Sequence, residues 1–349
     1  MFPLYSWLRS ICSNIYHLFS SIFNKASIFF SLPGSPIEQQ PRKADVGHPG
    51  NFVKADPENT TATPSLESSQ PPKTYPDDIT YICVSAESIN YSQPRHGEVI
   101  YVTKGEILAW GGTAILERLP SGAVMKTPIP NPYCPPEEQD HRRNMHVEAR
   151  IYVMIGDHPR VPRLICWDEE TCCLTLEYLE NGNLGDYIRQ NHQNITLQLR
   201  IRWSRQAAEA LTVLHNLDVI HCDLSPRNFL LDSHLDLKIA DFGGASLCGS
   251  DPSATPAIRF RPPGYDWNVP PVSGDDIFGL GSLIYFIMTS SYPYEEVASG
   301  EVERLYEVDK FPDLCSVICG NIIMQCWHRQ VDSVQVHDGL MAIERELSL

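Results

Sequence analysis

Three oxygen-bearing side chains, Asp223, Asn228 and Asp241, flank two short apolar runs that are separated by a turn. The runs, Phe229–Leu231 and Leu237–Ala240, are typical of strands, and the turn between them predicts a hairpin. Because a hairpin of this length brings its two ends together, we expect the three side chains to converge at one open edge. Magnesium prefers such hard oxygen ligands and keeps substrate phosphates in the rest of its shell. One carboxylate is then left to accept a proton from an incoming hydroxyl, which is the chemistry of phosphoryl transfer.

The residues around this hairpin also match a known pattern. The run His221–Asn228, His-Cys-Asp-Leu-Ser-Pro-Arg-Asn, resembles the catalytic loop H-R-D-L-x-x-x-N of eukaryotic protein kinases, and Asp241 begins the Asp-Phe-Gly of that family. The alternative is an ordinary hairpin with polar ends. The resemblance implies that the ATP γ-phosphate is transferred to a protein Ser/Thr (or Tyr) hydroxyl. It also implies that Asp223 deprotonates the hydroxyl, while Asn228 and Asp241 hold Mg²⁺.

The loop and the segment after it depart from the family pattern at several positions. Ser225 stands where serine/threonine kinases usually carry Lys. Arg227 resembles an Arg of tyrosine kinases and would supply positive charge to the transferring phosphate. Cys222 replaces the Arg that binds an activation-loop phosphate, so switching by such phosphorylation should matter less here. The hydroxyl residues after the Asp-Phe-Gly are expected to be solvated loop residues, with phosphorylation sites as the alternative: Ser246, Ser250, Ser253 and Thr255.

Upstream, residues 108–126 have a strand, loop, strand, turn, strand pattern. The stretch resembles the kinase hairpin that covers the nucleotide, G-x-G-x-x-G-x-V. Gly111 keeps the second glycine position and Gly112 follows it, so both are candidate nucleotide contacts. Ala109 and Ala114 replace the first and third glycines. Because alanine resists φ > 0, we expect weaker or slower nucleotide binding.

Lys126 ends this stretch, in the place of the family's V-A-I-K lysine. It would contact the nucleotide phosphates as a compact charge, the alternative being a solvated lysine at a strand end. Residues 137–155 predict a helix with an acidic start, and Met145 and Glu148 lie on one of its faces. Glu148 stands where the family's helix-C glutamate pairs with the lysine, so we expect a Lys126–Glu148 ion pair.

Residues 161–167 and 172–177 predict the last two strands of a small sheet. The segment that follows resembles the kinase hinge and contains Glu177 and Leu179. Free backbone N–H and C=O groups there would bind the edge of an adenine. Both residues are therefore candidate ATP contacts.

Residues 197–217 predict a long amphipathic helix that leads to the catalytic loop. The run Arg259–Gly264 resembles the end of the kinase activation segment, A-P-E, with Gly264 in place of the Glu. A buried ion pair should then be missing, which puts the anchoring of that segment in doubt. Asp276 starts an apolar stretch that resembles the family's central helix, and the resemblance implies that Asp276 ties down the catalytic loop.

Together these elements predict an α+β, two-lobed, protein-kinase-like fold, with a small antiparallel-sheet N-lobe and a mostly helical C-lobe. The expected kinase domain covers residues 77–349, with the N-lobe at 77–177 and the C-lobe at 183–349. Residues 33–76 are rich in Pro and Ser and have few large apolar side chains, which predicts a disordered linker.

The composition bounds the partners and the compartment. The net charge of −16 argues against a nucleic-acid partner, because phosphate backbones are held by Lys and Arg. The 11 cysteines form no C-x-x-C pair, which favours reduced thiols in an intracellular protein over a zinc site. We therefore expect an intracellular, cytoplasmic protein that acts on a protein substrate with ATP and Mg²⁺. The oligomeric state stays open.

Residues 1–32 form a hydrophobic segment, in which apolar side chains recur at helical spacing over residues 2–30. Its apolar runs are shorter than the ~18 residues that span a bilayer. Three interpretations stay open: peripheral membrane contact through an interfacial amphipathic helix, docking on the kinase-like body or an unstructured tail, and a targeting peptide.

Two other functions share parts of this pattern. A pseudokinase, a binding module that keeps the fold, would fit the altered glycine loop and Gly264, but Lys126 and Asp223 are both present. A small-molecule phosphotransferase of the aminoglycoside or choline kinase type shares H-x-D-x-x-x-x-N. The Asp-Phe-Gly at Asp241 and the apolar stretch after Asp276 argue against that alternative.

Overall fold

The computed structural model describes residues 79–85 and 93–347. By its contacts the chain divides into two units, Met1–Gln70 and Pro71–Leu349, and all described residues fall in the second. The predictions for the hydrophobic segment 1–32 and the linker 33–76 lie outside the described residues. None of the described helices is both long enough and apolar enough to cross a lipid bilayer.

The N-lobe contains an antiparallel five-stranded sheet in the order β3-β4-β5-β7-β6. Its strands, in chain order, are β3 (Glu106–Trp110), β4 (Ala114–Arg118), β5 (Val124–Pro128), β6 (Leu164–Asp168) and β7 (Cys173–Leu176). Successive side chains of a strand face opposite sides of its sheet. Because β5 is the central strand, its side chains are largely covered on both sides. The antiparallel sheet of the predicted N-lobe is confirmed.

A second, two-stranded sheet covers the outer face of the first. Strands β1 (Thr80–Ser85) and β2 (Glu98–Thr103) pair in parallel, an arrangement that the sequence patterns do not indicate. The β2 side chain Tyr101 packs with Ile115 of β4 in a small apolar cluster, so this pair of strands is a lid over the sheet.

Helix α2 (Pro135–Ile155) packs against the inner face of the sheet. A proline in its first turn and the acidic residues Glu137 and Glu138 suit a helix start, and the chain leaves the helix at Gly156 with φ 69°. The helix buries one face, which includes Met145 and Glu148. The predicted helix and its buried face are confirmed.

The C-lobe begins with α3 (Leu184–Asn191), a short 3₁₀ turn (His192–Asn194) and α4 (Leu197–His215). Thr196 caps α4 by accepting a hydrogen bond from the Leu199 N–H. Two small antiparallel pairs follow: β9 with β10 and β8 with β11. Their bounds are β8 (Val219–Ile220), β9 (Phe229–Leu231), β10 (Leu237–Ile239) and β11 (Ser246–Leu247).

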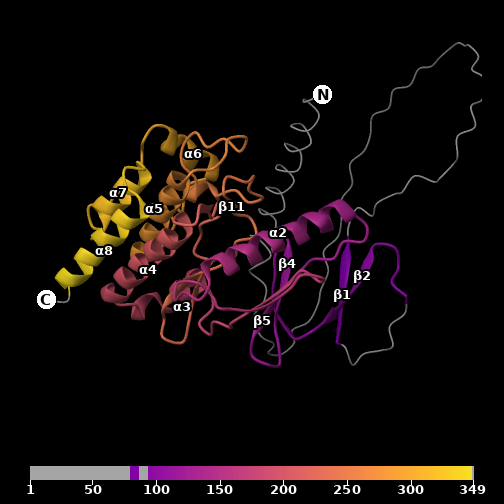
Figure 1. Cartoon of the computed structure of the whole chain (residues 1–349). Coiled ribbons are helices and arrows are strands. Elements are labelled where there is room, and N and C mark those ends of the chain that lie inside the picture. Colours follow the sequence, from indigo (N-terminus) through magenta and orange to yellow (C-terminus); the bar gives the residue numbers. More distant parts are fainter. Residues whose placement is uncertain (1–78, 86–92, 348–349) are drawn as a thin grey trace, which may run out of the picture. The chain divides into compact units, whose positions relative to one another are not determined.

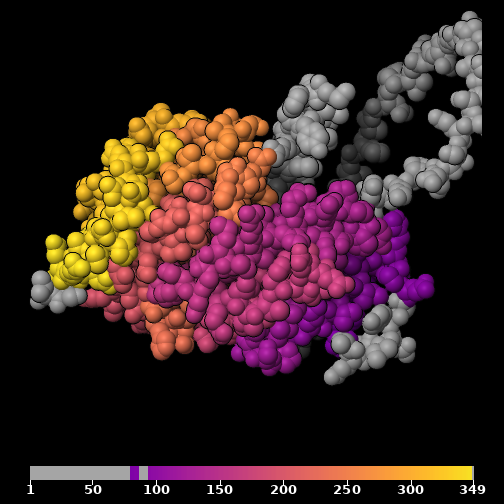
Figure 2. Space-filling model, in the orientation of Figure 1, coloured from indigo at the N-terminus to yellow at the C-terminus, as the bar shows by residue number. Residues whose placement is uncertain are grey.

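After a 3₁₀ turn at Ile258–Phe260, four helices complete the C-lobe. These are α5 (Ser273–Thr289), α6 (Ser299–Glu307), α7 (Gly320–Trp327) and α8 (Ser333–Leu347). Helix α8 packs along α4, and α7 along α5. Within the second unit, the strands β1 and β2 lie at the end opposite to α7 and α8 (Figure 1), and the same separation is seen in the space-filling view (Figure 2).

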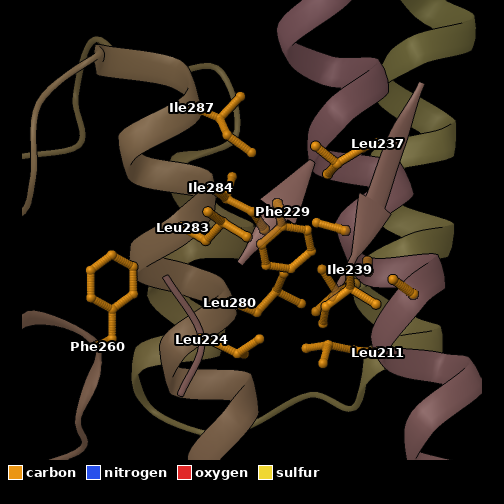
Figure 3. Close-up of a cluster of buried hydrophobic side chains, with 14 of the residues drawn as sticks. Leu211, Leu224, Phe229, Leu237, Ile239, Phe260, Leu280, Leu283, Ile284 and Ile287 are labelled. Carbon is orange, nitrogen blue, oxygen red and sulfur yellow. The ribbon is translucent and has the colours of Figure 1, made fainter. Parts of the chain in front are cut away.

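The core of the C-lobe forms around α5, which is buried on nearly every side. Figure 3 shows the Phe229 ring of β9 between α5 side chains, among them Leu280 and Ile284, and Ile239 of β10. Phe229 is fully buried, and it comes directly after Asn228 in the chain. The core therefore fixes the hairpin whose two ends carry the candidate functional residues, and the predicted α+β, two-lobed architecture is confirmed.

Candidate active site

The two charged residues expected to pair in the N-lobe do so. Lys126 lies on β5 and Glu148 on α2, and Lys126 Nζ donates to Glu148 Oε2 at 2.6 Å. The Glu148 side chain is 1% exposed and that of Lys126 is 8% exposed. Because one partner without the other would leave an uncompensated buried charge, the pair ties the helix to the sheet.

Asp241, which directly follows the β9–β10 hairpin, completes this cluster. Lys126 Nζ donates to Asp241 Oδ1, also at 2.6 Å, and joins residues 115 positions apart. The backbone of Asp241 adopts φ 70°, and its side chain is 54% exposed. Burial alone would lower the pKa of Lys126, but Asp241 and Glu148 raise it above its ordinary value. In turn, the lysine lowers the pKa of Asp241, so both groups stay charged at neutral pH.

The loop before the hairpin carries Asp223 and Asn228. Asn228 Nδ2 donates to the Asp223 backbone carbonyl at 2.7 Å and to its carboxylate Oδ2 at 3.2 Å. Burial raises the pKa of Asp223 to about 6, and the charge of Asp241 adds to the rise, while His221, Asn228 and Arg227 oppose it. Arg227 is exposed, and its positive charge lowers the pKa of both Asp223 and Asp241.

The carboxylate of Asp276 holds the backbone of this loop in place. Asp276, in the first turn of α5, accepts hydrogen bonds from the N–H groups of His221 at 2.8 Å and Cys222 at 3.1 Å. His215 Nε2 lies 3.1 Å from the same side chain. Asp276 is 2% exposed, so the contact that the resemblance implied is present in the core. Cys222 needs this support, because its backbone is held at φ 65°.

A row of buried rings links the loop to α2. His221 and Phe242 meet edge to face with centroids 5.7 Å apart, and Phe242 meets Tyr152 of α2 at 5.0 Å. All three are at most 1% exposed. The sequence patterns do not indicate this ring contact, because it depends on how the two lobes pack.

The donors at the edge of the hairpin fit a magnesium ion. Because the Nδ2 group of Asn228 is turned toward Asp223, its amide oxygen is directed away from that contact. Asp241 uses only Oδ1 for Lys126 and exposes the rest of its carboxylate. An amide and a carboxylate oxygen are a donor set that magnesium takes together with phosphate oxygens. Among the residues that the structure describes, no cluster of three His, Cys, Asp or Glu suggests a different metal centre.

The glycine-containing loop connects β3 and β4. Gly111 N–H donates to the Ala114 carbonyl at 2.9 Å, and both Gly111 and Gly112 are exposed. Ala109 and Ala114 lie in the strands, and neither is among the residues with positive φ. Since alanine is strained only at positive φ, the expected weakening of nucleotide binding loses its physical basis here.

The hinge follows β7 and offers backbone groups to a ligand. The Glu177 N–H donates to the Arg163 carbonyl at 3.0 Å, and the Leu179 carbonyl accepts from Gly182 N–H at 3.2 Å. The complementary groups, the Glu177 carbonyl and the Leu179 N–H, have no hydrogen-bond partner among the described residues. The Glu177 side chain forms an ion pair with Lys238 of β10, a contact across the lobes that the sequence does not indicate.

The end of the activation segment is anchored differently from the expectation. Gly264 does stand in place of a glutamate, at φ 69°. However, the Arg259 guanidinium donates to the carbonyls of Pro293 at 3.0 Å and Val297 at 2.6 Å, and to two carbonyls between them. Arg261 pairs with Glu303 of α6 at 2.6 Å. The expectation that this segment is poorly anchored was wrong, because Arg259, five residues before Gly264, donates hydrogen bonds to four backbone carbonyls.

Comparison with known proteins agrees with this geometry. A family model for protein tyrosine and serine/threonine kinases matches residues 133–334, more than half of the chain. The chain is 24% identical over 218 residues to an ephrin type-A receptor 5 of Gallus gallus, a match that covers 59% of the chain and 21% of the relative.

Two further relatives extend the comparison. A putative mitogen-activated protein kinase kinase kinase 7-like protein of Drosophila melanogaster is 32% identical over 148 residues, covering 40% of the chain and 38% of the relative. A melanoma receptor tyrosine-protein kinase of Xiphophorus maculatus is 30% identical over 199 residues, covering 53% and 17%. The chain thus spans well under half the length of the relatives it matches. The family model matches more than half of the chain, and the chain also contains the cluster of Lys126, Glu148 and Asp241. The chain therefore belongs to the protein tyrosine and serine/threonine kinase family.

Proposed function

We propose that this protein is an active kinase that transfers the γ-phosphate of ATP to a Ser/Thr (or Tyr) hydroxyl of a protein substrate. The observation that carries the proposal is the position of Lys126 Nζ, 2.6 Å from both Glu148 and Asp241. This contact joins the sheet, the helix α2 and the end of the hairpin at one point, and membership of the kinase family supports the same function.

Asp223 is the group that accepts the proton of the incoming hydroxyl. With a pKa of about 6, it is mainly ionised at neutral pH and yet more basic than an ordinary aspartate. Asn228 holds the carboxylate from one side, and so fixes the direction in which it accepts. Asp276 holds the loop backbone that carries both residues.

The phosphates of the nucleotide meet the positive groups of the cleft. Lys126 is kept charged and immobile by its two carboxylates, so it holds a phosphate in one place without a change of its own position. Arg227 adds a second positive charge beside the transferring group. Asn228 and Asp241 would hold the magnesium, which neutralises phosphate charge when it is bound.

The adenine end would bind at the hinge, where the Glu177 carbonyl accepts and the Leu179 N–H donates. Gly111 and Gly112 lie in the exposed loop between β3 and β4, and without side chains they allow the backbone to approach the phosphates. The acceptor is a protein hydroxyl, since the relatives that the chain resembles include kinases named for protein substrates.

The test is a radiolabel transfer assay with the full chain, magnesium and γ-labelled ATP on mixed peptides that carry Ser, Thr or Tyr. Asp223→Asn should lower the rate by about 10²–10⁴-fold, because the proton acceptor is lost. Asp338→Asn makes the same charge change on the exposed surface of α8 and should leave the rate unchanged. Equal labelling by wild type and Asp223→Asn would refute the proposal. Label on a sugar or amine, and never on protein, would instead indicate a small-molecule phosphotransferase.

A further inference from the structure

The segment after the Asp-Phe-Gly returns to its own starting point. The N–H groups of Ser253 and Ala254 both donate to the Gly244 carbonyl, at 3.1 and 3.2 Å. A Cβ atom on Gly244 would lie 2.2 Å from the Ala254 Cβ, so the two parts of the chain are in close contact. The segment between them is therefore a closed loop, and Ser253 stands at its base, beside Gly243.

At this base the Ser253 hydroxyl reaches helix α2. Its Oγ donates to Asn144 Oδ1 at 2.9 Å and lies 3.3 Å from the carbonyl oxygen of Gly243. Ser253 is an exposed loop residue, as expected, but its hydroxyl also bonds to a helix residue 109 positions earlier in the chain. For Ser246 the expectation of a solvated loop residue was wrong, since it is buried.

Asn144 precedes Glu148 by four residues, so the two side chains lie one turn apart on the same face of α2. Gly243 fits between them: a Cβ atom there would lie 3.4 Å from Glu148 Oε2 and 3.5 Å from Asn144 Cβ. The Ser253 contact is therefore made directly beside the ion pair with Lys126. A shift of α2 that separated Glu148 from Lys126 would also break this hydrogen bond.

The position before Asp223 in the catalytic loop carries Cys222, which cannot do this work through a phosphate. Cys222 is 2% exposed, and its thiol donates to the Ile220 carbonyl. A neutral thiol cannot pair with a phosphorylated activation segment as an arginine does. The contact made by Ser253 needs no phosphate, because both partners are neutral.

We propose that Ser253 and Asn144 are a positioning pair that keeps α2, and with it Glu148, at the active site without phosphorylation of the segment after the Asp-Phe-Gly. The proposal rests on the proposed kinase function for its activity readout, but the position of α2 is a property of the fold alone. The two can therefore be tested separately.

The first experiment is a double-mutant cycle on the full chain. Ser253→Ala and Asn144→Ala should each lower kcat about two- to tenfold, the range expected for one exposed hydrogen bond, with a smaller change in the KM for ATP. The double variant should be no worse than either single one. Ser253→Thr keeps the hydroxyl and should stay near wild type. Additive losses in the double variant, or a Thr variant as slow as Ala, would overturn the pair.

The second experiment does not depend on catalysis. Amide hydrogen exchange of residues 135–155, measured without nucleotide, should speed up in Ser253→Ala and not in Ser253→Thr. Unchanged exchange in the Ala variant would refute the positioning role even if the protein is an active kinase. If wild type proves inactive, the kinase proposal fails, while the exchange result still decides the role of the pair.

A third measurement addresses phosphorylation itself. Wild-type protein treated with a phosphatase, and shown by mass spectrometry to carry no phosphate, should keep its activity. Loss of activity on this treatment would overturn the claim that the pair replaces a phosphate.

Discussion

The two faces of strand β5 carry two polar clusters that resemble each other in composition and differ in what they do. Lys126 faces inward to Glu148 and Asp241, and we call these three the inner cluster. The neighbouring Thr127 faces the other way, since successive side chains of a strand alternate. Around it lies the outer cluster, which comprises Tyr101, Lys104, Glu117 and Thr127. Each cluster contains a lysine and a glutamate that is at most 1% exposed.

The outer cluster satisfies its own glutamate from nearby residues. Glu117 Oε1 accepts from the N–H groups of Lys104 at 2.7 Å and Gly105 at 3.3 Å, and Oε2 accepts from the Tyr101 hydroxyl. Burial and Glu117 raise the pKa of Tyr101, so its hydroxyl remains a donor at physiological pH. All these groups belong to residues 101–117. The carboxylate closes the turn between β2 and β3 and leaves no oxygen for a ligand.

The inner cluster instead joins three segments that are far apart in the chain, and it leaves Asp241 half exposed. The difference teaches that burial alone does not identify a functional carboxylate. A carboxylate saturated by its neighbours stabilises a turn. A cluster that connects distant segments and keeps a carboxylate exposed, as Asp241 is, can act on a substrate.

Among the tests of this comparison, the largest effect is expected from replacing the lysine of the inner cluster with methionine. Lys126→Met should lower kcat/KM by about 10²–10³-fold, because the fixed charge that meets the phosphates is lost. Lys104→Met is the matched control, since Lys104 Nζ lies outside the inner cluster and contacts Thr127 and Cys173 at 3.4 and 3.5 Å. It should stay within about twofold of wild type in the same peptide assay. Similar losses in both variants would remove the distinction between the clusters.

The outer cluster should show itself in stability. Glu117→Leu leaves the Tyr101 hydroxyl and two N–H groups without acceptors and should lower the free energy of unfolding by about 1–3 kcal/mol. Glu117→Gln keeps one acceptor oxygen, and its amide can donate to the Tyr101 oxygen, so it should be much less destabilised. Denaturant unfolding measures both, and the KM for ATP should not change. A large rise in that KM would contradict a purely structural role.

The pH dependence of the rate should report Asp223. Because the proton acceptor works only when ionised, activity should fall about tenfold per pH unit below its pKa of about 6. The positive charge of Arg227 lowers that pKa, so Arg227→Met should move the acidic limb of the profile to higher pH. A kcat profile from pH 4.5 to 8.5 gives the midpoint. An unmoved midpoint in the Arg227 variant would show that its charge does not reach the carboxylate.

The smallest effect concerns Tyr152, whose ring packs on Phe242 next to the inner cluster. Its hydroxyl is buried and has no hydrogen-bond partner within the described part of the chain. Tyr152→Phe keeps the ring contact and removes this group, so stability should be unchanged or rise by about 1 kcal/mol. Thermal unfolding is sufficient to measure it. A clear loss of stability would mean that the hydroxyl has a partner after all.

Much of the site could be predicted from short stretches of sequence. The hairpin that carries Asn228 and Asp241 follows from two apolar runs around a turn, and the buried face of α2 follows from helical spacing. The Lys126–Glu148 pair could be predicted because each residue has a fixed place in a family motif. The roles of Asp223, Arg227 and the hinge residues in catalysis and ATP binding stay predictions, which the assays above address.

Other features could not be predicted in this way. The glycine loop was expected to suffer from Ala109 and Ala114, but only the backbone angles show that these alanines are unstrained. The loss of a glutamate at Gly264 suggested poor anchoring, whereas Arg259 is held by carbonyls more than 30 residues further on. Neither the backbone angle nor the distant carbonyls leave a trace in the local pattern.

By itself, the sequence determined which charged residues belong to the site and which faces of the helices and strands are buried, because motifs and periodicity are local properties of the chain. Only the tertiary structure decided which of two buried glutamates belongs to a site, and that a serine after the Asp-Phe-Gly bonds to α2. Both contacts join segments that are more than a hundred residues apart in the chain. Such contacts depend on how the two lobes pack. Hydrophobic periodicity predicts that one face of a helix or strand is buried, but it does not predict which segment buries it.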